Sequence, residues 1–491
     1  MTRAALLLFA LVAAACLPAA GPPDAPATPD AHAWMAVRHL QRVPERDRCF
    51  VRYVSWLAVP KEKVRAWQSV CVWWLNQLST EQAVARPSPV PGSGGLLWSL
   101  DLRDYRWNAR GWRVVARREP YTREPWVDAA AAKLLRALAG VEAEPSGDGT
   151  VPLVVLVRAD WLFRETLESA RSDAYYDLLF AARRFPEGRE AIDFPRNEDD
   201  WNDFFGIKDA ADYLARQKID VRVGAVVAGS RDDPKGGSIV ARQNRVVQIL
   251  PTAYGVAMKT FDARKTAGDT DYIERVPEVA VGKIRFDAGE LLASLPNGGQ
   301  AGLLIDGAGK RLEFATGEFV HPKGPDARTP DVRTMMGCVI CHAPDGGLIP
   351  PKDAFKELLK GGVDLKIKDR ETANRVKAFF LRWDGRVKGW QAPYLALVAD
   401  CTADPVTGRG MTAVALVKEF MAFRDWYDDP VPPTQAAREL GHPEPVVKGA
   451  CAKSVKARLA QLAAGKPVPR EAFERDAYRE AALLLSAKEY R

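Results

Sequence analysis

The chain has 491 residues, enough for two to four domains with a substantial core. Hydrophobic residues make up 47% of the chain and charged residues 27%, as in an ordinary soluble globular protein. The net charge of +7 is spread over 70 basic and 63 acidic residues without a long basic run, which argues against nucleic-acid binding.

The N-terminal residues 1–20 have the pattern of an export signal. Arg3 precedes the apolar run Ala4–Ala15, which is too short to span a bilayer, and Cys16 follows. Two outcomes stay open: plain cleavage at Ala-x-Ala, or a bacterial lipoprotein signal with Cys16 acylated, although Ala13 stands where Leu or Val is usual. The Pro-rich segment 21–30 predicts an extended tether. We therefore expect a bacterial periplasmic protein or outer-membrane lipoprotein.

Apolar periodicity predicts the elements up to the middle of the chain. We expect helices over 31–80, 128–138 and 161–184, and strands over 96–102, 151–157, 221–227 and 238–249. The Pro- and Gly-rich stretch 87–95 marks a boundary. Further on, Asn297-Gly298 predicts a hairpin between 291–296 and 300–305, because Asn-Gly supplies the positive φ of tight turns. A second turn leads into 310–314, so a small antiparallel meander precedes residue 338.

The stretch Gly337-Cys338-Val339-Ile340-Cys341-His342 carries the chemistry. Cys-x-x-Cys-His is the attachment signature of c-type haem, in which two thiols form thioether bonds and the histidine binds the iron. The spacing i, i+3 and i+4 puts all three side chains on one side of a helical turn. Gly337, without a side chain, allows close packing beside the macrocycle. A redox dithiol or a zinc site is the alternative, but zinc needs two more ligands and no second such motif exists.

The remaining third of the chain is predicted to be mostly helical. Helices are expected over 352–360, 370–382, 411–427, 434–440 and 446–464. The predicted fold class is α+β, a central α/β body with antiparallel strands followed by a mainly α-helical c-type haem domain. The expected parts are a helical N-terminal segment over 31–90, the α/β body over 91–315, and the haem domain over 316–491.

The sixth iron ligand decides what the haem can do. Met411 could supply an axial thioether, and His321 could reach the distal face; an open site is the third possibility. Arg333, five residues before Cys338, is the best candidate to pair a haem propionate. Pro350 could provide the carbonyl that fixes the tautomer of His342.

The other cysteines suggest disulfides. If Cys16 carries lipid, four remain outside the motif, an even number in an oxidising compartment. Proximity in sequence favours Cys49–Cys71 and Cys401–Cys451, while buried free thiols are the alternative.

Several blocks together resemble a family of large exported mono-haem c-type cytochrome-like proteins of environmental bacteria. They are Arg52–Ser55, Gly94–Tyr105, Val157–Trp161, Tyr175–Leu179, Gln243–Arg245 with Tyr254-Gly255, Ser294–Gln300, Cys338–His342 and, more weakly, Ala437–Gly441. Family motifs usually have Met-Gly between the cysteines, where this chain has Val339-Ile340. The resemblance implies an exported haem protein without implying a particular reaction.

These observations lead us to expect one covalent haem and one-electron transfer in the cell envelope with a redox partner protein. A haem enzyme or sensor with an open distal site, such as a peroxidase-like protein, is the alternative. An envelope binding protein with a structural haem is a third reading, because the α/β body is far larger than electron transfer needs. The sequence does not specify the redox partner, the potential, the oligomeric state or any substrate.

Overall fold

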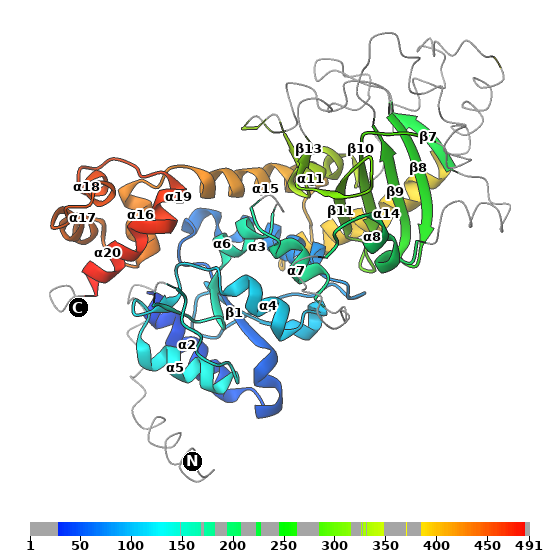
Figure 1. The fold of residues 1–491 in the computed structure, drawn as a ribbon. Helices are drawn as coiled ribbons and strands as arrows, with labels where there is room; N and C mark the ends of the chain where they lie inside the picture. The colour runs from blue at the N-terminus through cyan, green and yellow to red at the C-terminus, as the bar shows by residue number, and fades with distance from the viewer. Residues whose placement is uncertain are drawn as a thin grey trace.

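The computed structural model describes residues 28–147, 149–167, 171–181, 194–207, 222–226, 245–262, 284–315, 326, 328–329, 331–347, 370 and 384–486. An N-terminal α/β region with sheets is followed by a mainly helical C-terminal region (Figure 1). The predicted mixed class and the order of its two parts are thus confirmed. Within these described residues no helix has the length and apolarity needed to cross a membrane. The signal segment and Cys16 lie outside them.

The first sheet has four strands in the order β2-β3-β1-β6. Its strands are β1 (Val51–Ser55), β2 (Ser88–Pro89), β3 (Leu97–Asp101) and β6 (Leu156–Arg158). The strand β1 pairs antiparallel with β3 and parallel with β6, and all five of its residues are buried. Strand β3 confirms the prediction over 96–102. The wholly helical prediction over 31–80 is wrong at β1, because a five-residue buried strand is too short to show a period of its own.

Helices precede, connect and follow the strands of this sheet, and the last of them, α8, lies beside the second sheet, where Lys259 of that sheet pairs with Glu198. They are α2 (Pro29–Arg42), η1 (Glu45–Phe50), α3 (Lys61–Gln77), η2 (Leu102–Tyr105), α4 (Ala109–Ala116), α5 (Ala129–Leu138), α6 (Ala159–Glu165), α7 (Ala174–Leu179) and α8 (Glu198–Phe205). The prediction over 128–138 is confirmed by α5, which begins after Asp128, whose side chain accepts from the amide of Ala131.

Two predicted elements are divided in the structure. The apolar run 151–157 holds two short strands, β5 (Val151–Pro152) and β6, because Val154 between them has φ +61°, outside the range of a strand. The helix predicted over 161–184 is represented by α6 and the separate α7, and residues 168–170 and 182–193 lie outside the described part.

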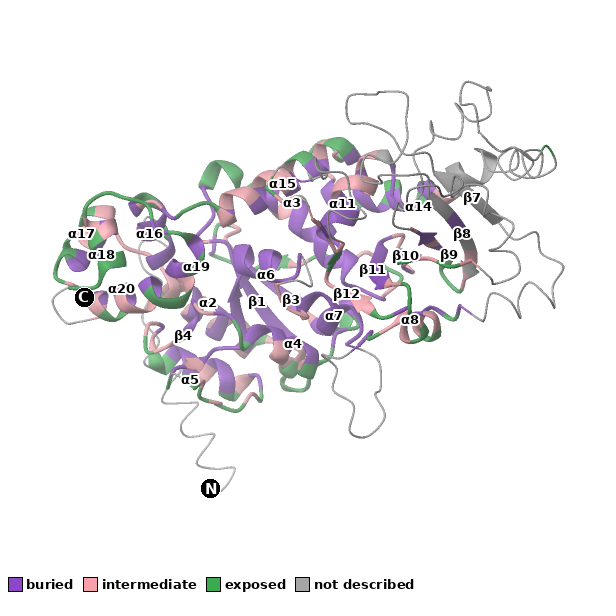
Figure 2. Cartoon of the chain, turned by 45° about the horizontal axis from the view of Figure 1, so that its top comes forward, coloured by how far each residue is buried: buried purple, intermediate pink, exposed green. Residues whose placement is uncertain are grey.

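The second sheet is an antiparallel meander with the order β12-β11-β10-β9-β8-β7. Its strands are β7 (Arg222–Val226), β8 (Arg245–Thr252), β9 (Gly255–Phe261), β10 (Ala288–Ser294), β11 (Gln300–Asp306) and β12 (Arg311–Leu312). The hairpin predicted at Asn297-Gly298 is confirmed, with Ser294 opposite Gln300 and a five-residue connection. Six of the seven residues in each of β10 and β11 are buried, as Figure 2 shows by their colour, and β9 is also largely buried.

The meander leads into the Cys-x-x-Cys-His segment through a two-strand ribbon. Strand β13 (Phe314–Ala315) pairs with β14 (Val332–Arg333), which runs into α11 (Met336–His342) and the short η5 (Ala343–Asp345). The predicted order of meander followed by motif is therefore confirmed. The helices predicted over 352–360 and 370–382 lie almost entirely outside the described residues.

The C-terminal region is helical as predicted. It contains α14 (Asp384–Thr402), α15 (Ala413–Asp428), α16 (Pro433–Leu440), α17 (Glu444–Ala452), α18 (Ala457–Ala463), α19 (Arg470–Ala472), η6 (Phe473–Ala477) and α20 (Tyr478–Leu485). The helix predicted over 446–464 is instead two, α17 and α18. Helix α14 has no counterpart in the sequence prediction, because Pro393 inside it is a residue that normally ends helices.

A continuous aromatic core joins the two regions. In Figure 1, α15 runs from the C-terminal helices past α6 and α3 toward α11. Its Phe423 stacks on Trp67 of α3, with ring centroids 4.6 Å apart, and on Phe163 of α6 at 4.4 Å. Aromatic side chains of α3, α6 and α15 therefore form the core between the two regions.

A buried ionic cluster also joins the regions. Arg158, at the end of β6, donates to Glu439 of α16 at 2.9 Å and to Asp160 at 3.1 Å. Arg470 of α19 donates to both oxygens of Glu439, at 2.8 and 2.9 Å. The side chains of Arg158, Glu439 and Arg470 are at most 5% exposed. Arg158, Asp160, Glu439 and Arg470 therefore form one buried ionic cluster between the two regions.

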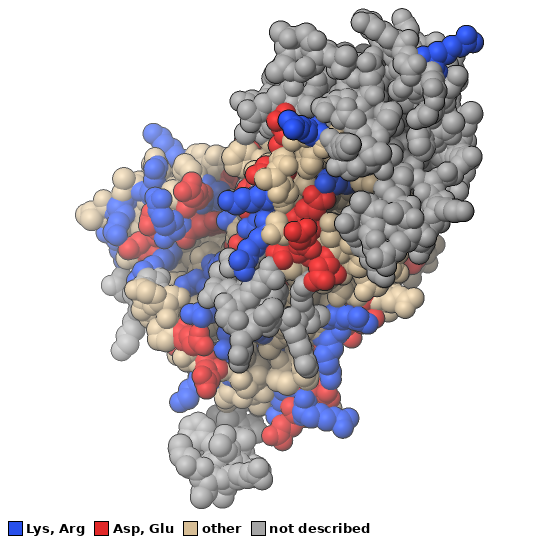
Figure 3. All heavy atoms as spheres, turned by 45° about the vertical axis from the view of Figure 1, so that its right-hand side comes forward, with Lys and Arg blue, Asp and Glu red and all other residues tan. Residues whose placement is uncertain are grey.

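Surface charges of both signs are interspersed. On the face shown in Figure 3, basic and acidic side chains of the described residues alternate over the helical surface. Exposed ion pairs among the described residues include Arg65–Asp404 and Lys456–Glu480.

Candidate functional site

The Cys-x-x-Cys-His segment forms one short helix, α11, as its spacing predicts. Met335, which precedes the helix, has φ +66°, so the chain turns sharply from β14 into it. Gly337 is needed for close packing within the chain itself. A Cβ there would lie 2.6 Å from Cγ1 of Val332, so the glycine lets the helix pack on its own lead-in strand.

The two thiols of the motif are not in a disulfide bond, and they differ in burial. Cys338 is 4% exposed, whereas Cys341 and His342 are half-buried. The thiol of Cys338 packs against Gly302 of β11. A Cβ on Gly302 would lie 3.1 Å from both Sγ of Cys338 and Sδ of Met335, so this strand approaches α11 only because position 302 has no side chain.

A buried carboxylate, Glu290 of β10, lies beside two of the motif residues. Its Oε2 is 3.6 Å from Nε2 of His342, and the Cys338 thiol hydrogen-bonds to it. Burial first, and the charge of Glu290 next, raise the pKa of the Cys338 thiol well above its ordinary value. Cys338 is therefore a neutral thiol at physiological pH, not an activated nucleophile.

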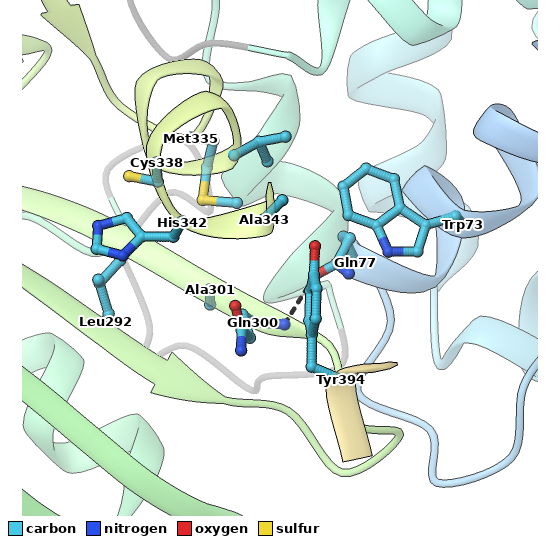
Figure 4. Close-up of a pocket in the computed structure, with 11 residues that line it drawn as sticks. Trp73, Gln77, Leu292, Gln300, Ala301, Met335, Cys338, His342, Ala343 and Tyr394 are labelled. Atoms are coloured by element: carbon cyan, nitrogen blue, oxygen red, sulfur yellow. Dashed lines mark hydrogen bonds between the residues drawn. The ribbon is translucent and has the colours of Figure 1, made fainter. Parts of the chain in front are cut away.

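A pocket with an empty volume of about 270 Å³ opens between α11, the β10–β11 hairpin, α3 and α14 (Figure 4). Cys338 and His342 lie on its α11 wall, and Tyr394 stands on the opposite, α14 wall. Most of its lining is apolar. The lining residues are Trp73, Gln77, Leu292, Gln300, Ala301, Met335, Cys338, Val339, His342, Ala343 and Tyr394.

The β10–β11 turn holds this pocket together. The Asn297 side chain donates to the carbonyl of Asn76 at 2.9 Å, and the Gln300 amide donates to Oε1 of Gln77 at 2.7 Å. Gly298 has φ +87°, and a Cβ there would lie 2.5 Å from the carbonyl oxygen of Pro393. The turn is thus fixed between the end of α3 and the middle of α14. As a result α3, the β10–β11 hairpin and α14, which are distant in sequence, meet at α11.

The predicted ligands outside the motif are not gathered at this pocket. Met411 precedes α15, where its amide donates to Oγ1 of Thr402, and it does not line the pocket. Arg333 is half-buried on β14, three residues before α11, and does not line the pocket either. His321 and Pro350 lie outside the described residues. His32 is buried far from the motif in sequence, and its Nδ1 hydrogen-bonds to Oγ of Ser55 at 2.9 Å.

The other cysteines do not form the suggested disulfides. Cys49, Cys71, Cys401 and Cys451 are all free, so the pairings Cys49–Cys71 and Cys401–Cys451 are wrong. Cys49 is exposed on η1, whereas Cys71 is fully buried within α3. Burial raises the pKa of Cys401 to about 12 and that of Cys451 to about 11, as for cysteines that act as small core residues.

The residues at α11 fit covalent haem better than they fit the alternatives. A structural zinc site takes four protein ligands, and no group of three or more metal-binding side chains occurs among the described residues. A redox dithiol needs an accessible thiol of lowered pKa, and Cys338 has the opposite properties. Haem attachment needs two thiols outside disulfide bonds and an imidazole beside an apolar space; α11 carries Cys338, Cys341 and His342, of which Cys338 and His342 line the pocket.

The empty volume of about 270 Å³ includes space that is open to solvent, so the enclosed part of the pocket is much smaller. Residues 316–325 and 348–369, on either side of the motif in sequence, lie outside the described part.

Sequence reasoning identified α11 but missed the residues that face it. Trp73 fitted the apolar stripe of its helix, Tyr394 lies in the unpredicted α14, and Glu290 lies in a strand that was predicted only from residue 291 onward. One local feature could have indicated a site on α3: Gln77, a polar residue, ends an otherwise apolar run of buried residues. Comparison of the chain with protein-family models, curated proteins and solved structures finds no match.

Proposed function

We propose that this chain is an exported c-type cytochrome that binds one haem covalently and transfers single electrons in the cell envelope. The observation that carries the proposal is the position of Cys338 and His342 on one helical turn, both lining a largely apolar pocket. When bound, the haem would supply a one-electron iron couple.

The chain's own residues would have separate tasks. Cys338 and Cys341 would anchor the porphyrin, and His342 would bind the iron as its fifth ligand. Leu292, Val339 and Ala343 would exclude water from the ring, because they form the apolar lining beside these groups. A dry, low-dielectric surrounding is one means by which a protein tunes a haem potential.

The alternative, a haem enzyme or sensor with an open distal site, is favoured by a different observation. Met411 does not line the pocket, so it is not in place to be the sixth iron ligand. Among the described lining residues, the side chain outside α11 that could bind the iron from the opposite wall is Tyr394, through its phenol oxygen. Burial raises the pKa of Tyr394, so its phenol stays neutral and is a poor iron ligand at physiological pH.

The cellular setting follows from the N-terminal sequence. A signal segment followed by the Pro-rich tether suits a protein held at a membrane surface through acylated Cys16, or released into the periplasm. A redox partner protein is part of the proposal, and nucleic acid is not, because the charges are balanced.

The test is expression in a bacterial host that matures c-type haem. We expect an intact mass that exceeds the mature polypeptide by one haem, and a haem absorption spectrum that survives denaturation. Cys338→Ser with Cys341→Ser should abolish attachment, and His342→Ala should change the iron ligation.

The matched control is Cys401→Ser, which removes another buried free thiol without lining the pocket. It should leave attachment unchanged. A colourless wild-type protein with the mass of the bare polypeptide would refute the proposal. A high-spin spectrum that shifts on addition of cyanide would favour the open-site alternative, and a spectrum altered by Met411→Ala would favour ligation by that methionine.

A further inference from the structure

Helices α17 and α18 carry a basic surface. Residues 444–466, which form these helices and the turns beside them, contain five lysines and arginines and one acidic residue, Glu444. Glu444 is paired with Lys448 of its own helix at 2.6 Å. The exposed basic side chains beyond this pair are Lys453, Lys456, Arg458 and Lys466. These four residues, together with Val455, are called the α17–α18 surface below.

The turn between the two helices ends in an apolar side chain. Val455 is fully exposed and lies between the lysines at positions 453 and 456. A single exposed valine is ordinary in soluble proteins. Its place among basic residues gives the α17–α18 surface the combination that binds at a bilayer interface, where amines meet lipid phosphates and a small apolar group enters the boundary of the acyl chains.

The N-terminal tether brings this surface close to a membrane. Eleven residues, 17–27, connect Cys16 to Thr28, whose side chain caps α2. Fully extended, they reach at most about 40 Å. Next to Thr28, Pro29 packs on the turn between α16 and α17, where a Cβ on Gly441 would lie 2.7 Å from Cδ of Pro29. Helix α17 begins three residues after Gly441 and is about 14 Å long, so the α17–α18 surface lies within this reach.

Charge distinguishes the two surfaces beside the tether. The other one is the start of α5, where the amide of Asp128 donates to the carboxylate of Asp30 at 2.7 Å, so both side chains there are acidic. An anionic membrane repels that surface and attracts the α17–α18 surface. In Figure 1, α17 and α18 lie at one end of the molecule and the second sheet lies at the other. A bilayer at α17 and α18 therefore leaves the side of the molecule that carries α11 open to the aqueous space.

We propose that the α17–α18 surface binds an anionic phospholipid bilayer, and that the acylated chain docks on the membrane through it. The inference rests on the proposed function for its cellular setting, a chain anchored through Cys16, and not on the haem. The basic side chains pair with lipid phosphates, and Val455 enters the headgroup boundary. The docked orientation presents α11 to a redox partner in solution.

The first test measures binding of the mature polypeptide, residues 17–491 made without lipid, to two kinds of vesicle. One kind contains phosphatidylglycerol and phosphatidylethanolamine in equal amounts, and the other contains phosphatidylcholine alone. We expect the protein to sediment with the anionic vesicles and not with the neutral ones. Added salt should release it, because the attraction is between exposed charges.

The test variant removes three charges of the α17–α18 surface, Lys453→Gln with Lys456→Gln and Arg458→Gln. Each basic residue near an anionic surface strengthens binding about fivefold. Lys456 is partly neutralised by Glu480 at 2.9 Å, so binding to the anionic vesicles should weaken about 25-fold or more.

The matched control removes three exposed charges from α3, Lys61→Gln with Lys63→Gln and Arg65→Gln. It has the same net charge as the test variant and also loses one surface ion pair, Arg65–Asp404. It should bind the anionic vesicles like the wild type. Equal binding of the test variant and the wild type would overturn the inference, and so would a wild type that stays in solution. Haem attachment is read separately by mass, so either result leaves the proposed cytochrome intact.

A second measurement uses the full-length acylated protein in the anionic vesicles. A water-soluble amine reagent should label Lys453 and Lys456 several times more slowly there than in the lipid-free polypeptide. Lys61 and Lys63 should react equally in both. Unchanged labelling of Lys453 and Lys456 would mean that the surface faces solution, where it would suit a soluble acidic protein, and would overturn docking on the bilayer.

Discussion

Glu439 is the residue whose removal should most weaken the joint between the two regions of the protein. Its carboxylate, fully buried, accepts from Arg158 at 2.9 Å and from Arg470 at 2.8 and 2.9 Å, while Gln435 adds a bond at 3.0 Å. Glu439→Ala would leave the Arg470 guanidinium buried without a carboxylate. Arg158 would keep Asp160.

The expected loss follows from this geometry. Removing one partner of a buried pair costs about 3–5 kcal/mol, because the remaining charge stays desolvated. Burial alone would raise the pKa of Glu439, but Arg158 and Arg470 outweigh it and lower the pKa to about 2. The carboxylate therefore stabilises the fold above pH 4.5, and this contribution is lost as the pH falls toward 2. Glu439→Gln should lose less stability than Glu439→Ala and flatten this acid dependence.

Urea denaturation followed by tryptophan fluorescence measures the free energy of unfolding of each variant. The control is Glu480→Ala, which breaks the exposed pair with Lys456 and should change stability by less than about 1 kcal/mol. Equal stabilities of Glu439→Ala and Glu480→Ala would refute the assignment of the buried cluster as the joint.

Three further predictions concern single positions. Burial raises the pKa of Asp177 from 3.8 to about 7, with Arg118 opposing it at 3.5 Å, so the folded state loses stability as the pH rises from about 4 to 7. Asp177→Asn should then be the more stable form at pH 8, by up to about 4 kcal/mol, and show no gain at pH 4 in urea denaturation. Gly302→Val should collide with Cys338, cost about 1–3 kcal/mol and reduce the haem attached per chain by mass spectrometry. Asn297→Ala loses its bonds to Asn76 and Gly299, so its free energy of unfolding should fall by about 1–3 kcal/mol and its thermal transition should come at a lower temperature. An unchanged transition would contradict the docking role of this turn.

Local signals predicted much of the fold. The Asn297-Gly298 turn, the strand over 96–102 and the helix after Asp128 depend on neighbours in sequence, and all three are confirmed. The misses have equally physical causes. Strand β1 is short and lies between helices in the chain, so it shows no period of its own. Helix α14 contains Pro393, and proline normally ends a helix. The suggested disulfides relied on proximity in sequence, and Cys71 is instead enclosed in the core.

The sequence by itself determined the arrangement within α11. Cys338, Cys341 and His342 are spaced i, i+3 and i+4, and in a helix these positions lie on the same face. Only the tertiary structure decided what faces them. Glu290, Trp73, Gln77 and Tyr394 come from three separate elements, and they meet α11 because Gly302 and Gly298 permit close approach and the β10–β11 turn docks between α3 and α14. Such contacts depend on the shapes of distant surfaces, which no local periodicity encodes.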